Sequence, residues 1–278
     1  MTRLLSCFVF AVLLLSCTAQ VDPTAEGPVL ILYAFNEEGQ KISDRMDIRT
    51  VEHRLGREVK TGQLAGLDIV LAESGVGMTN AAMSAQHLID SYRPVMIVMT
   101  GIAGGLDSTV RIGDVAVCRS WVQHDYVYVG NDSTRHRGIH VYHPPRDSII
   151  RTSSFPIDSS LFAAAGTIKA DRLDLKDIDG REPVLHVGGV GISGNGFIDS
   201  REKRSQLVAQ FDALIVDMES AAVVHVGLVN DLPVIVIRSA SDLAGGSDEG
   251  SARDQLDQFF QVAADNSAEI LEAFLRTL

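Results

Sequence analysis

Residues 95–106 read VMIVMTGIAGGL, an apolar run that leads directly into a glycine-rich stretch. The continuous apolar part is typical of a strand that is buried on both faces of a sheet, and the glycines predict a turn at 101–105. Apolar runs of the same kind occur at 29–35 (VLILYAF), 213–218 (ALIVDM) and 233–238 (PVIVIR). Strands of this kind indicate a sheet that is covered by helices on both faces.

The segments between these runs carry signals for helices and for a hairpin. Apolar residues recur at helical spacing in several of them, and Ala65-Gly66 separates two strand-like stretches as a hairpin turn does. Helices are expected at 37–53, 79–92, 158–170, 200–210, 219–230 and 253–275, the hairpin at 57–64 and 67–74, and short strands at 113–118 and 184–191. The sequence therefore predicts an α/β fold, a single domain with a mixed, largely parallel central sheet and helices on both faces.

Length and composition agree with this prediction. The chain has 278 residues, of which 46% are hydrophobic and 22% charged, an ordinary globular composition with ample apolar material for a core. Its 24 basic and 36 acidic residues give a formal net charge of −12. Because a net acidic surface repels phosphate backbones, nucleic acid is not expected as a partner, and small neutral or cationic ligands remain open.

The first 20 residues, MTRLLSCFVFAVLLLSCTAQ, have the layout of an export signal. Arg3 precedes an apolar run at 4–15 that is too short to span a bilayer comfortably. Leu14-Leu15-Ser16-Cys17 resembles the bacterial lipoprotein box, in which the cysteine becomes lipidated. We therefore expect export to the periplasm or cell envelope, with contact to the membrane only through a lipid anchor at Cys17. A plain secretory signal cleaved near Ala19 is the alternative.

The domain organisation follows from this N-terminus and from a change in character further along. We expect a signal peptide at 1–16, a tether at 17–28 and one domain at 29–278. From 124 to 156, His, Tyr, Arg, Pro, Ser and Asp dominate without a sustained period, which predicts a long loop or insertion. Its aromatic side chains either line a substrate pocket or pack against a neighbouring subunit; they are Tyr126, Tyr128, Tyr142 and Phe155.

The histidines of the insertion raise the question of a metal site. His136, His140 and His143 lie close together in the sequence, but Gly138 and Pro144-Pro145 oppose the helix that would align them. No cysteine or carboxylate at a matching spacing completes a ligand set. No metal site is therefore predicted.

Carboxylates follow the ends of predicted strands at Glu38, Glu219 and Asp242. Each alone is explained by a favourable place near a helix start or a turn. Together they point to one crevice, because ligands of open α/β sheets bind beyond the carboxyl ends of the strands. Carboxylates on one rim can divide into acid, base and sugar-binding roles when their surroundings separate their pKa values.

The region from about residue 29 to 278 resembles the superfamily of nucleoside phosphorylases and nucleosidases, most closely the bacterial 5′-methylthioadenosine/S-adenosylhomocysteine nucleosidases. The resemblance rests on motifs that occur in the family's order over nearly the whole domain. They are AFNEE (34–38), ESGVG (73–77), TGIAGGL (100–106), SGNGFI (193–198), VDMESAAVVHV (216–226) and VIRSASD (236–242).

The resemblance implies hydrolysis of an N-glycosidic bond. Glu38 matches the glutamate that positions and activates the attacking water, and Asp242 matches the aspartate that acts as general acid at purine N7. Glu219 matches the glutamate that accepts hydrogen bonds from the ribose hydroxyls. These roles suit a reaction that passes through a cation-like ribosyl state, which a nearby carboxylate stabilises. No metal or organic cofactor is expected.

Further residues match the family's substrate-binding positions. The resemblance implies that Phe197 stacks on the purine and that the Ile198 backbone forms hydrogen bonds to the purine edge. It places Met218 beside the ribose and Phe35 at the ribose end of the pocket. It also implies that Ser241 and Arg238 support Asp242 and Glu38. Family members are dimers, trimers or hexamers, so a homo-oligomer is expected by resemblance.

The sequence also departs from the family at informative positions. Met99 and Ile102 stand where the phosphorylases have an arginine and a serine that hold phosphate, and neither can bind an anion. Water is therefore the expected nucleophile. A further departure is Asn195, which stands where the family usually has an aspartate. The sequence predicts a purine nucleosidase acting on adenosine-type nucleosides such as 5′-methylthioadenosine or S-adenosylhomocysteine. A phosphate-dependent phosphorylase and a non-catalytic nucleoside-binding lipoprotein are the alternatives.

Overall fold

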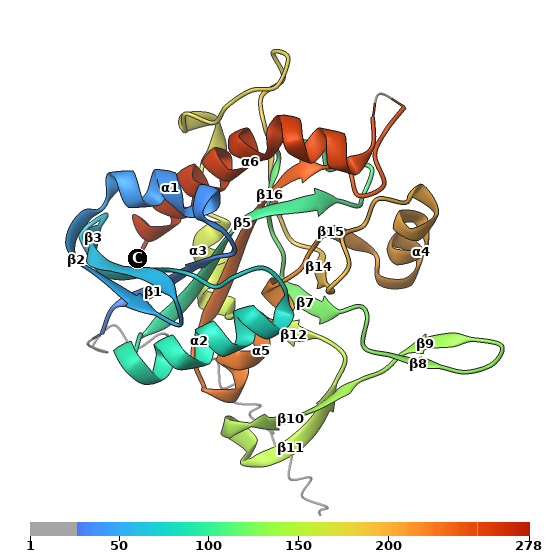
Figure 1. Ribbon diagram of the computed structural model, residues 1–278, viewed down its shortest axis with the longest axis horizontal. Helices are drawn as coiled ribbons and strands as arrows, with labels where there is room; N and C mark the ends of the chain where they lie inside the picture. The colour runs from blue at the N-terminus through green and yellow to red at the C-terminus, as the bar shows by residue number, and fades with distance from the viewer. Residues whose placement is uncertain (1–26, 249) are drawn as a thin grey trace, which may run out of the picture.

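The computed structural model describes residues 27–248 and 250–278 (Figure 1). The expected signal peptide at 1–16, Cys17 and the expected tether up to residue 26 lie outside the described residues. Within the described ranges, none of the helices combines the length and apolar character needed to cross a membrane.

A large mixed sheet organises the chain. Among the described residues twelve strands join it, in the order β12-β7-β14-β15-β5-β1-β4-β3-β2; off this path β16 pairs with β5, β6 with β16, and β13 with β6. The strands are β1 (Val29–Tyr33), β2 (Asp47–Arg54), β3 (Arg57–Leu64), β4 (Leu67–Glu73), β5 (Met96–Gly105), β6 (Val115–Val117), β7 (Ser120–Gln123), β12 (Phe155–Pro156), β13 (Leu185–Val187), β14 (Val190–Ser193), β15 (Ala213–Asp217) and β16 (Val234–Asp242).

The centre of this sheet is parallel, as the buried apolar runs predict. β1 pairs in parallel with β4 and β5, and β5 pairs in parallel with β16. Every residue of β1 and β16 is buried, because helices cover both faces of a sheet of this kind. Antiparallel pairs lie towards the edges and between β15 and β5. The sheet is therefore mixed but parallel at its centre, and the expected α/β fold is confirmed.

Helices lie on both faces of the sheet (Figure 1). α1 (Asn36–Arg45) and α6 (Ala252–Leu275) cover one face, and α2 (Met78–Tyr92) and α5 (Ser220–Val229) cover the other. α3 (Ser159–Ala165), α4 (Arg201–Phe211) and the 3₁₀ turn η2 (Ala170–Arg172) complete the described helices outside the insertion. α6 starts at a capping box, in which the Ser251 side chain accepts from the Asp254 amide and the Asp254 side chain accepts from the Ser251 amide.

The helix expected at 37–53 is only half right. α1 ends at Arg45, and 47–54 forms the edge strand β2, paired antiparallel with β3. The residues of β2 alternate between two polar faces and are mostly exposed, so no apolar period marks them as a strand. Pairing with β3 satisfies the backbone groups there, and this tertiary contact overrides the local signal.

The turn expected at 101–105 is also wrong, because β5 continues as a strand to Gly105. Gly101 has φ +135° within that strand, a conformation that side chains rarely adopt. The glycines therefore mark close approach of other groups to the strand rather than a change of direction.

The segment 124–156 is not the irregular loop that its composition predicts. β8 (Val127–Val129) pairs with β9 (Thr134–His136), and β10 (Ile139–His143) pairs with β11 (Ser148–Thr152) around the 3₁₀ turn η1 (Pro144–Arg146). Both hairpins extend away from the central sheet (Figure 1). Their strands are short and largely exposed on both faces, so they lack the alternation of buried apolar and exposed polar residues on which strand prediction depends.

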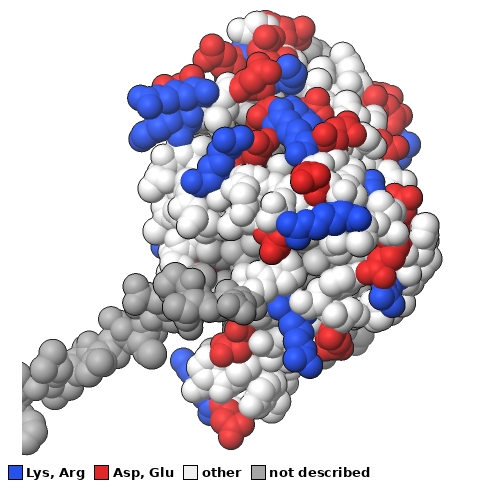
Figure 2. Space-filling view, turned by 90° about the vertical axis from the view of Figure 1, so that its left-hand side faces the viewer, with Lys and Arg blue, Asp and Glu red and all other residues white. Residues whose placement is uncertain are grey.

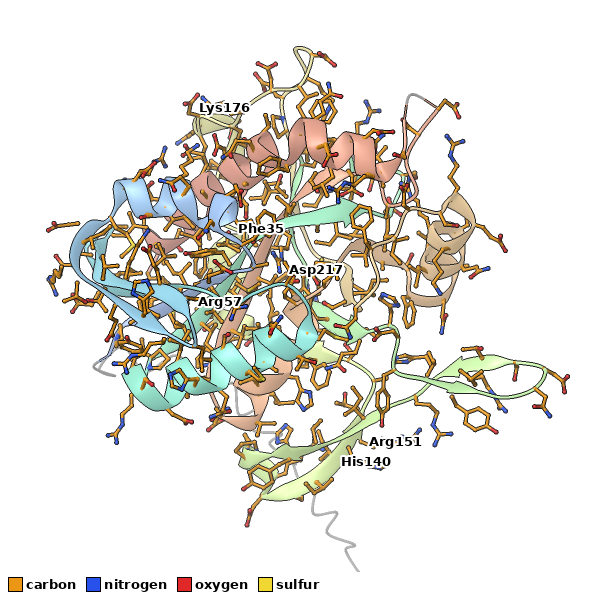
Figure 3. The ribbon with its side chains drawn as sticks, viewed as in Figure 1. Phe35, Arg57, His140, Arg151, Lys176 and Asp217 are labelled. Atoms are coloured by element: carbon orange, nitrogen blue, oxygen red, sulfur yellow. The ribbon has the colours of Figure 1, made fainter. Side chains whose placement is uncertain are left out.

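The histidines of this segment are dispersed. His140 faces Arg151 across the β10–β11 pair, and Figure 3 shows both on the outlying hairpin, away from Phe35 and Asp217 at the centre. His136 lies in the other hairpin, where its Nε2 is 3.0 Å from the Gln123 carbonyl oxygen. Across residues 27–248 and 250–278 no group of three or more His, Cys, Asp or Glu side chains is placed to hold a metal ion.

One face of the molecule carries charges of both signs. On the face shown in Figure 2, Lys and Arg side chains lie among Asp and Glu side chains rather than forming one continuous basic surface. This face therefore offers no extended electrostatic track for a nucleic acid backbone.

Candidate active site

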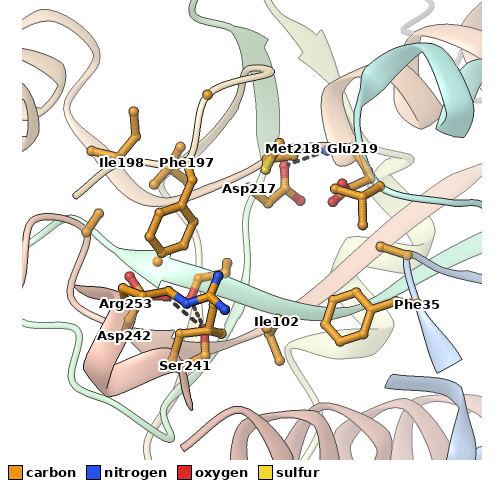
Figure 4. A pocket seen from close by; sticks show the side chains of 18 of the residues that line it. Phe35, Ile102, Phe197, Ile198, Asp217, Met218, Glu219, Ser241, Asp242 and Arg253 are labelled. Atoms are coloured by element: carbon orange, nitrogen blue, oxygen red, sulfur yellow. Dashed lines mark hydrogen bonds between the residues drawn. The ribbon is translucent and has the colours of Figure 1, made fainter. Parts of the chain in front are cut away.

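A cavity of about 340 Å³ opens at the carboxyl ends of the central strands. Its size is within the range of small-molecule pockets. Figure 4 shows Phe197 with Ser241 and Asp242 towards one end, and Glu219 and Phe35 towards the other. The lining residues are Ala34, Phe35, Glu38, Val76, Ile102, Ala103, Gly104, Gly196, Phe197, Ile198, Val216, Asp217, Met218, Glu219, Ser241, Asp242, Ala244, Arg253 and Leu256. The carboxylates at 38, 219 and 242 thus share one cavity.

Asp242 is the last residue of β16 and is almost completely buried. The Ser241 hydroxyl donates to its Oδ2 over 2.9 Å. Burial raises the pKa of Asp242 to about 7; the negative charge of Asp199 adds to this, whereas the Ser241 hydroxyl and the Arg204 guanidinium oppose it. At neutral pH this carboxyl group therefore carries a proton in a large fraction of molecules and can act as an acid.

At the other end of the cavity, Arg238 holds together a cluster of carboxylates. Its side chain is fully buried, and its nitrogens lie 3.4 Å from Glu38 Oε1, 2.8 Å from Asp217 Oδ2 and 3.1 Å from Glu219 Oε2. It also donates to the Thr100 carbonyl oxygen over 3.1 Å. One guanidinium thus faces three carboxylates, so burial of the cluster favours retention of protons by some of its members.

Glu38 lies in the first turn of α1, with its side chain directed back at β5. Its Oε2 accepts from the Ala34 amide at 2.5 Å and its Oε1 from the Ile102 amide at 2.7 Å. Burial raises the pKa of Glu38 above its ordinary value, while Arg238 and these amides hold the rise back. The carboxylate is fixed in direction and more basic than a surface glutamate, as a general base requires.

Glu219 directly precedes α5 and is buried beside the same arginine. The Gly77 amide donates to its Oε1 over 2.8 Å. Burial raises the pKa of Glu219 to about 7 against the opposing charge of Arg238, and the neighbouring Asp217 and Glu38 carboxylates add to the rise. A carboxylate held in this way can accept hydrogen bonds from a ligand's hydroxyl groups.

Gly101 leaves the space that Glu38 and Arg238 occupy. A Cβ atom at this position would lie 2.1 Å from Glu38 Oε1 and 2.6 Å from Arg238 Nη1. The Gly101→Ala substitution is therefore expected to displace both side chains and to lower kcat/KM by about 100-fold, the cost of misplacing reacting groups by about 1 Å. Steady-state kinetics beside a thermal melt measures the effect.

Gly130→Ala is the matched control for this prediction. Its added Cβ would meet only the exposed Tyr128 ring and the Ser133 carbonyl at 3.1 Å and beyond, and its φ requires no glycine. It should leave kcat/KM unchanged. A Gly101→Ala variant that is as active as this control contradicts the placement of Glu38 and Arg238.

The apolar residues expected in the site also line the cavity. Phe197 and Ile198 come from the loop after β14, Met218 lies between β15 and α5, and Phe35 precedes α1. Phe197 is 46% exposed at the pocket mouth. The Ile198 carbonyl oxygen accepts from the Gly245 amide over 3.0 Å, which fixes the end of its loop. The Ser241 hydroxyl contacts Asp242, and the Arg238 guanidinium contacts Glu38.

Asp217 is a site residue that the sequence did not single out. It ends β15, pairs with Arg238, accepts hydrogen bonds from the Ser193 and Ser220 hydroxyls, and lines the cavity. The available signal was an acidic residue that closes an otherwise apolar strand, directly before Met218. Such a charge is almost never buried without partners.

α6 adds a basic residue to the pocket mouth that was also missed. Arg253 lines the cavity from the first turn of α6, and its Nε lies 3.2 Å from Asp257 Oδ1. Both side chains are largely exposed, so this pair contributes little to stability. Since α6 reads as an ordinary amphipathic helix, nothing in its pattern distinguishes this arginine from a surface residue.

The two positions at which the phosphorylases hold phosphate are apolar in space as well as in sequence. Met99 is fully buried within β5 and is not among the lining residues, whereas Ile102 lines the cavity. The aromatic residues of the insertion do not line the cavity of the single chain either. Phe155 is buried and stacks on His225, while Tyr126, Tyr128 and Tyr142 are exposed.

Comparison with known proteins places these features in a family. The model of the phosphorylase superfamily matches residues 28–276. A 5′-methylthioadenosine/S-adenosylhomocysteine nucleosidase of Geobacillus thermodenitrificans is 30% identical over 246 residues, which are 88% of this chain and 94% of that protein.

Solved structures agree with the sequence comparison. The 5′-methylthioadenosine/S-adenosylhomocysteine nucleosidase of Neisseria meningitidis in complex with methylthio-immucillin-A has a TM-score of 0.73 at 25% identity, covering 91% of this chain and 100% of that one. The futalosine hydrolase of Helicobacter pylori has the same TM-score and identity, covering 91% and 98%. Since the family model spans nearly the whole described chain, the protein belongs to the phosphorylase superfamily.

Proposed function

We propose that this protein is a purine nucleosidase, which hydrolyses the N-glycosidic bond of adenosine-type nucleosides such as 5′-methylthioadenosine and S-adenosylhomocysteine. The observation that carries the proposal is the division of one cavity into two ends. One end holds Asp242 with a raised pKa, and the other holds Glu38 and Glu219 around Arg238. The similarity to nucleosidases supports the same function.

In this mechanism the base leaves before the nucleophile is fully bonded. Asp242 gives its proton to N7 of the purine while the bond between the ribose C1′ and the base breaks. The positive charge that develops on the ribosyl ring is stabilised by the nearby carboxylates. Glu38 takes a proton from the attacking water, whose oxygen bonds to C1′. The electron pair of the broken bond stays with the base, and the products are the free base and the free sugar. Glu38 then gives its proton to solvent and Asp242 takes one up, which restores both groups.

The substrate binds across the two ends of the cavity, with the purine at the Asp242 end and the ribose at the Glu38 and Glu219 end. Phe197 stacks on the purine and the Ile198 backbone meets its edge, while Glu219 accepts hydrogen bonds from the ribose hydroxyls and Met218 lies beside the ring. Phe35 closes the ribose end. Water rather than phosphate is the nucleophile, since Met99 and Ile102 supply no group that binds an anion.

The pH dependence of kcat/KM follows from the raised pKa values. Asp242 must keep its proton to act as an acid, and its pKa is about 7, so kcat/KM is expected to fall as pH rises through about 7. Glu38 must be ionised to act as a base, and burial raises its pKa, so the acid limb should lie above the ordinary glutamate value of about 4.3. The expected profile is a bell. An activity that still rises through pH 8 contradicts the role of Asp242.

The substrate range is tested by release of free base from a panel of nucleosides. The panel holds 5′-methylthioadenosine, S-adenosylhomocysteine, adenosine, inosine and uridine, each with and without phosphate. Release from the adenosine-type substrates without phosphate is the expected result. Release that requires phosphate identifies a phosphorylase, and tight binding without turnover identifies a nucleoside-binding protein; either result overturns the proposal.

We propose further that the protein is exported and anchored to the cell envelope through a lipid on Cys17. The basis is the N-terminal sequence alone: a short apolar run that ends in Leu-Leu-Ser-Cys. Mass spectrometry of the N-terminal peptide from membrane fractions should find a lipidated Cys17, and Cys17→Ser should release the protein to the soluble fraction. An unmodified, soluble mature protein contradicts the anchor.

We also propose that the protein is a homo-oligomer. The projecting hairpins expose apolar and aromatic side chains, among them Tyr128, Val129 and Ile149, and exposed apolar patches of this kind suit contacts with another chain. A second copy is the expected partner. One full chain has a mass of 30.0 kDa, so light scattering in solution should give the mass of two or more chains, and a monomer at micromolar concentration contradicts the proposal.

A further inference from the structure

The loop 193–198, which carries Phe197, is held at its start by contacts to the insertion. Gly194 packs against the ring of His124 so closely that a Cβ at 194 would lie 2.3 Å from His124 Nε2. The next amide, that of Asn195, donates to Asp125 Oδ2 over 2.9 Å. The backbone of the loop is therefore fixed two residues before Phe197, the residue proposed to stack on the purine.

The side chain of Asn195 makes a second contact, to a different element. Its Oδ1 accepts from the amide of Met78, the first residue of α2, over 3.1 Å. The preceding amide in the chain, that of Gly77, donates to Glu219 Oε1 over 2.8 Å. Two successive amides at the start of α2 therefore bind two different parts of the pocket. The Met78 amide holds the loop at the purine end, and the Gly77 amide holds the carboxylate at the ribose end.

We infer that Asn195 is a positioning residue that couples the base-stacking loop to the ribose-binding carboxylate Glu219 through the first amides of α2. The inference rests on the proposed nucleosidase function. A shift of the loop away from α2 removes the acceptor from the Met78 amide, and the Gly77 amide moves with its neighbour. Binding of the purine at the base end of the cavity and hydrogen bonding of the ribose hydroxyls to Glu219 therefore depend on each other.

The test compares substrates that differ only at the sugar. Wild type and Asn195→Ala are assayed on 5′-methylthioadenosine and on its 2′-deoxy analogue, which lacks a hydroxyl group for Glu219. Loss of one hydrogen bond is expected to lower kcat/KM on the ribosyl substrate by about three- to tenfold. If the two ends are coupled, the 2′-deoxy substrate loses clearly less, so the preference of the enzyme for the 2′-hydroxyl falls by a similar factor.

Two further variants separate positioning from general damage. Asn195→Asp keeps an acceptor oxygen for the Met78 amide and should restore both values to within about twofold of wild type, since the hydrogen bond is retained. Gln206→Ala removes an exposed amide of α4 that donates a hydrogen bond to Glu202 of the same helix, and it should leave kcat/KM on both substrates unchanged. Asn195 is itself exposed, so its variants are expected to fold.

The outcomes distinguish this inference from the proposed function. A wild-type protein that hydrolyses neither substrate overturns both. An active wild type, combined with Asn195→Ala losses that are equal on the two substrates or absent, overturns the coupling alone. An Asn195→Asp variant that is as impaired as Asn195→Ala also overturns it, because the acceptor is then not what matters.

Discussion

Asp242→Asn is expected to lower kcat for hydrolysis of 5′-methylthioadenosine by about 1000-fold, within the range that a positioned general acid contributes. The asparagine keeps the shape of the buried side chain and its contact with Ser241 but has no acidic proton to give. Steady-state release of adenine measures the loss. A variant that retains a tenth or more of the wild-type kcat contradicts the assignment of Asp242 as the acid.

The leaving group offers a sharper form of this test. A 4-nitrophenyl riboside releases a phenolate that needs no proton, so Asp242→Asn should lose far less activity on it than on the nucleoside. Equal losses on both compounds show instead that the variant has damaged the site as a whole.

Stability provides the folding control for the same variant. The pKa of Asp242 is raised in the folded protein from 3.8 to about 7, so the folded state binds its proton more tightly than the unfolded state does. This contribution to stability is complete below the unfolded value and is lost as pH rises through about 7. At about 1.4 kcal/mol per unit, Asp242→Asn should gain up to about 4 kcal/mol over wild type between pH 4 and pH 8. Urea unfolding at both pH values measures it, and an advantage that does not grow with pH contradicts the raised pKa.

Glu38→Gln is expected to lower kcat by about 100- to 10,000-fold on the nucleoside and on the 4-nitrophenyl riboside alike, because both reactions need an activated water. This pattern differs from that of Asp242→Asn, which should spare the second compound. A Glu38→Gln variant that spares the riboside contradicts the role of Glu38 as the base.

The glutamine also disturbs the local hydrogen bonds. Both oxygens of Glu38 accept from backbone amides, at Ala34 and Ile102, and a glutamine can offer an acceptor to only one of them. A loss of stability of about 1–3 kcal/mol is therefore expected. Binding of adenine, measured beside a thermal melt, separates this loss of stability from a loss of catalysis. A folded variant that binds adenine but hydrolyses no substrate has lost only the general base.

The sequence predicts the centre of the fold because burial on both faces leaves a plain signal. β1 and the first four residues of β16, 234–237, are continuous apolar runs, and short runs of this kind are consistent with strands that are buried on both faces. β2 gave no such signal, because both of its faces are largely exposed and its partner β3 supplies the stabilisation. The hairpins within 124–156 were missed for the same reason.

The site shows the same division. Glu38, Glu219 and Asp242 could be found because acidic residues directly after apolar strands are conspicuous and because their motifs resemble a known family. Asp217 was missed because it lies inside the predicted strand 213–218, and its partner Arg238 comes from a different strand. Gly101 was taken for a turn, although its role depends on Glu38 and Arg238 approaching the strand in space. Contacts of this kind between distant segments leave no local pattern.

The central claim is hydrolysis of a purine nucleoside by water in this cavity, and the products of 5′-methylthioadenosine test it most directly. The purified protein is incubated with this substrate in buffer without phosphate and in buffer with excess phosphate, and the adenine and the sugar are identified. We predict adenine and the free sugar, 5-methylthioribose, at the same rate in both buffers. Adenine release only in the phosphate buffer, with the sugar 1-phosphate as product, or no release in either buffer, would contradict the account.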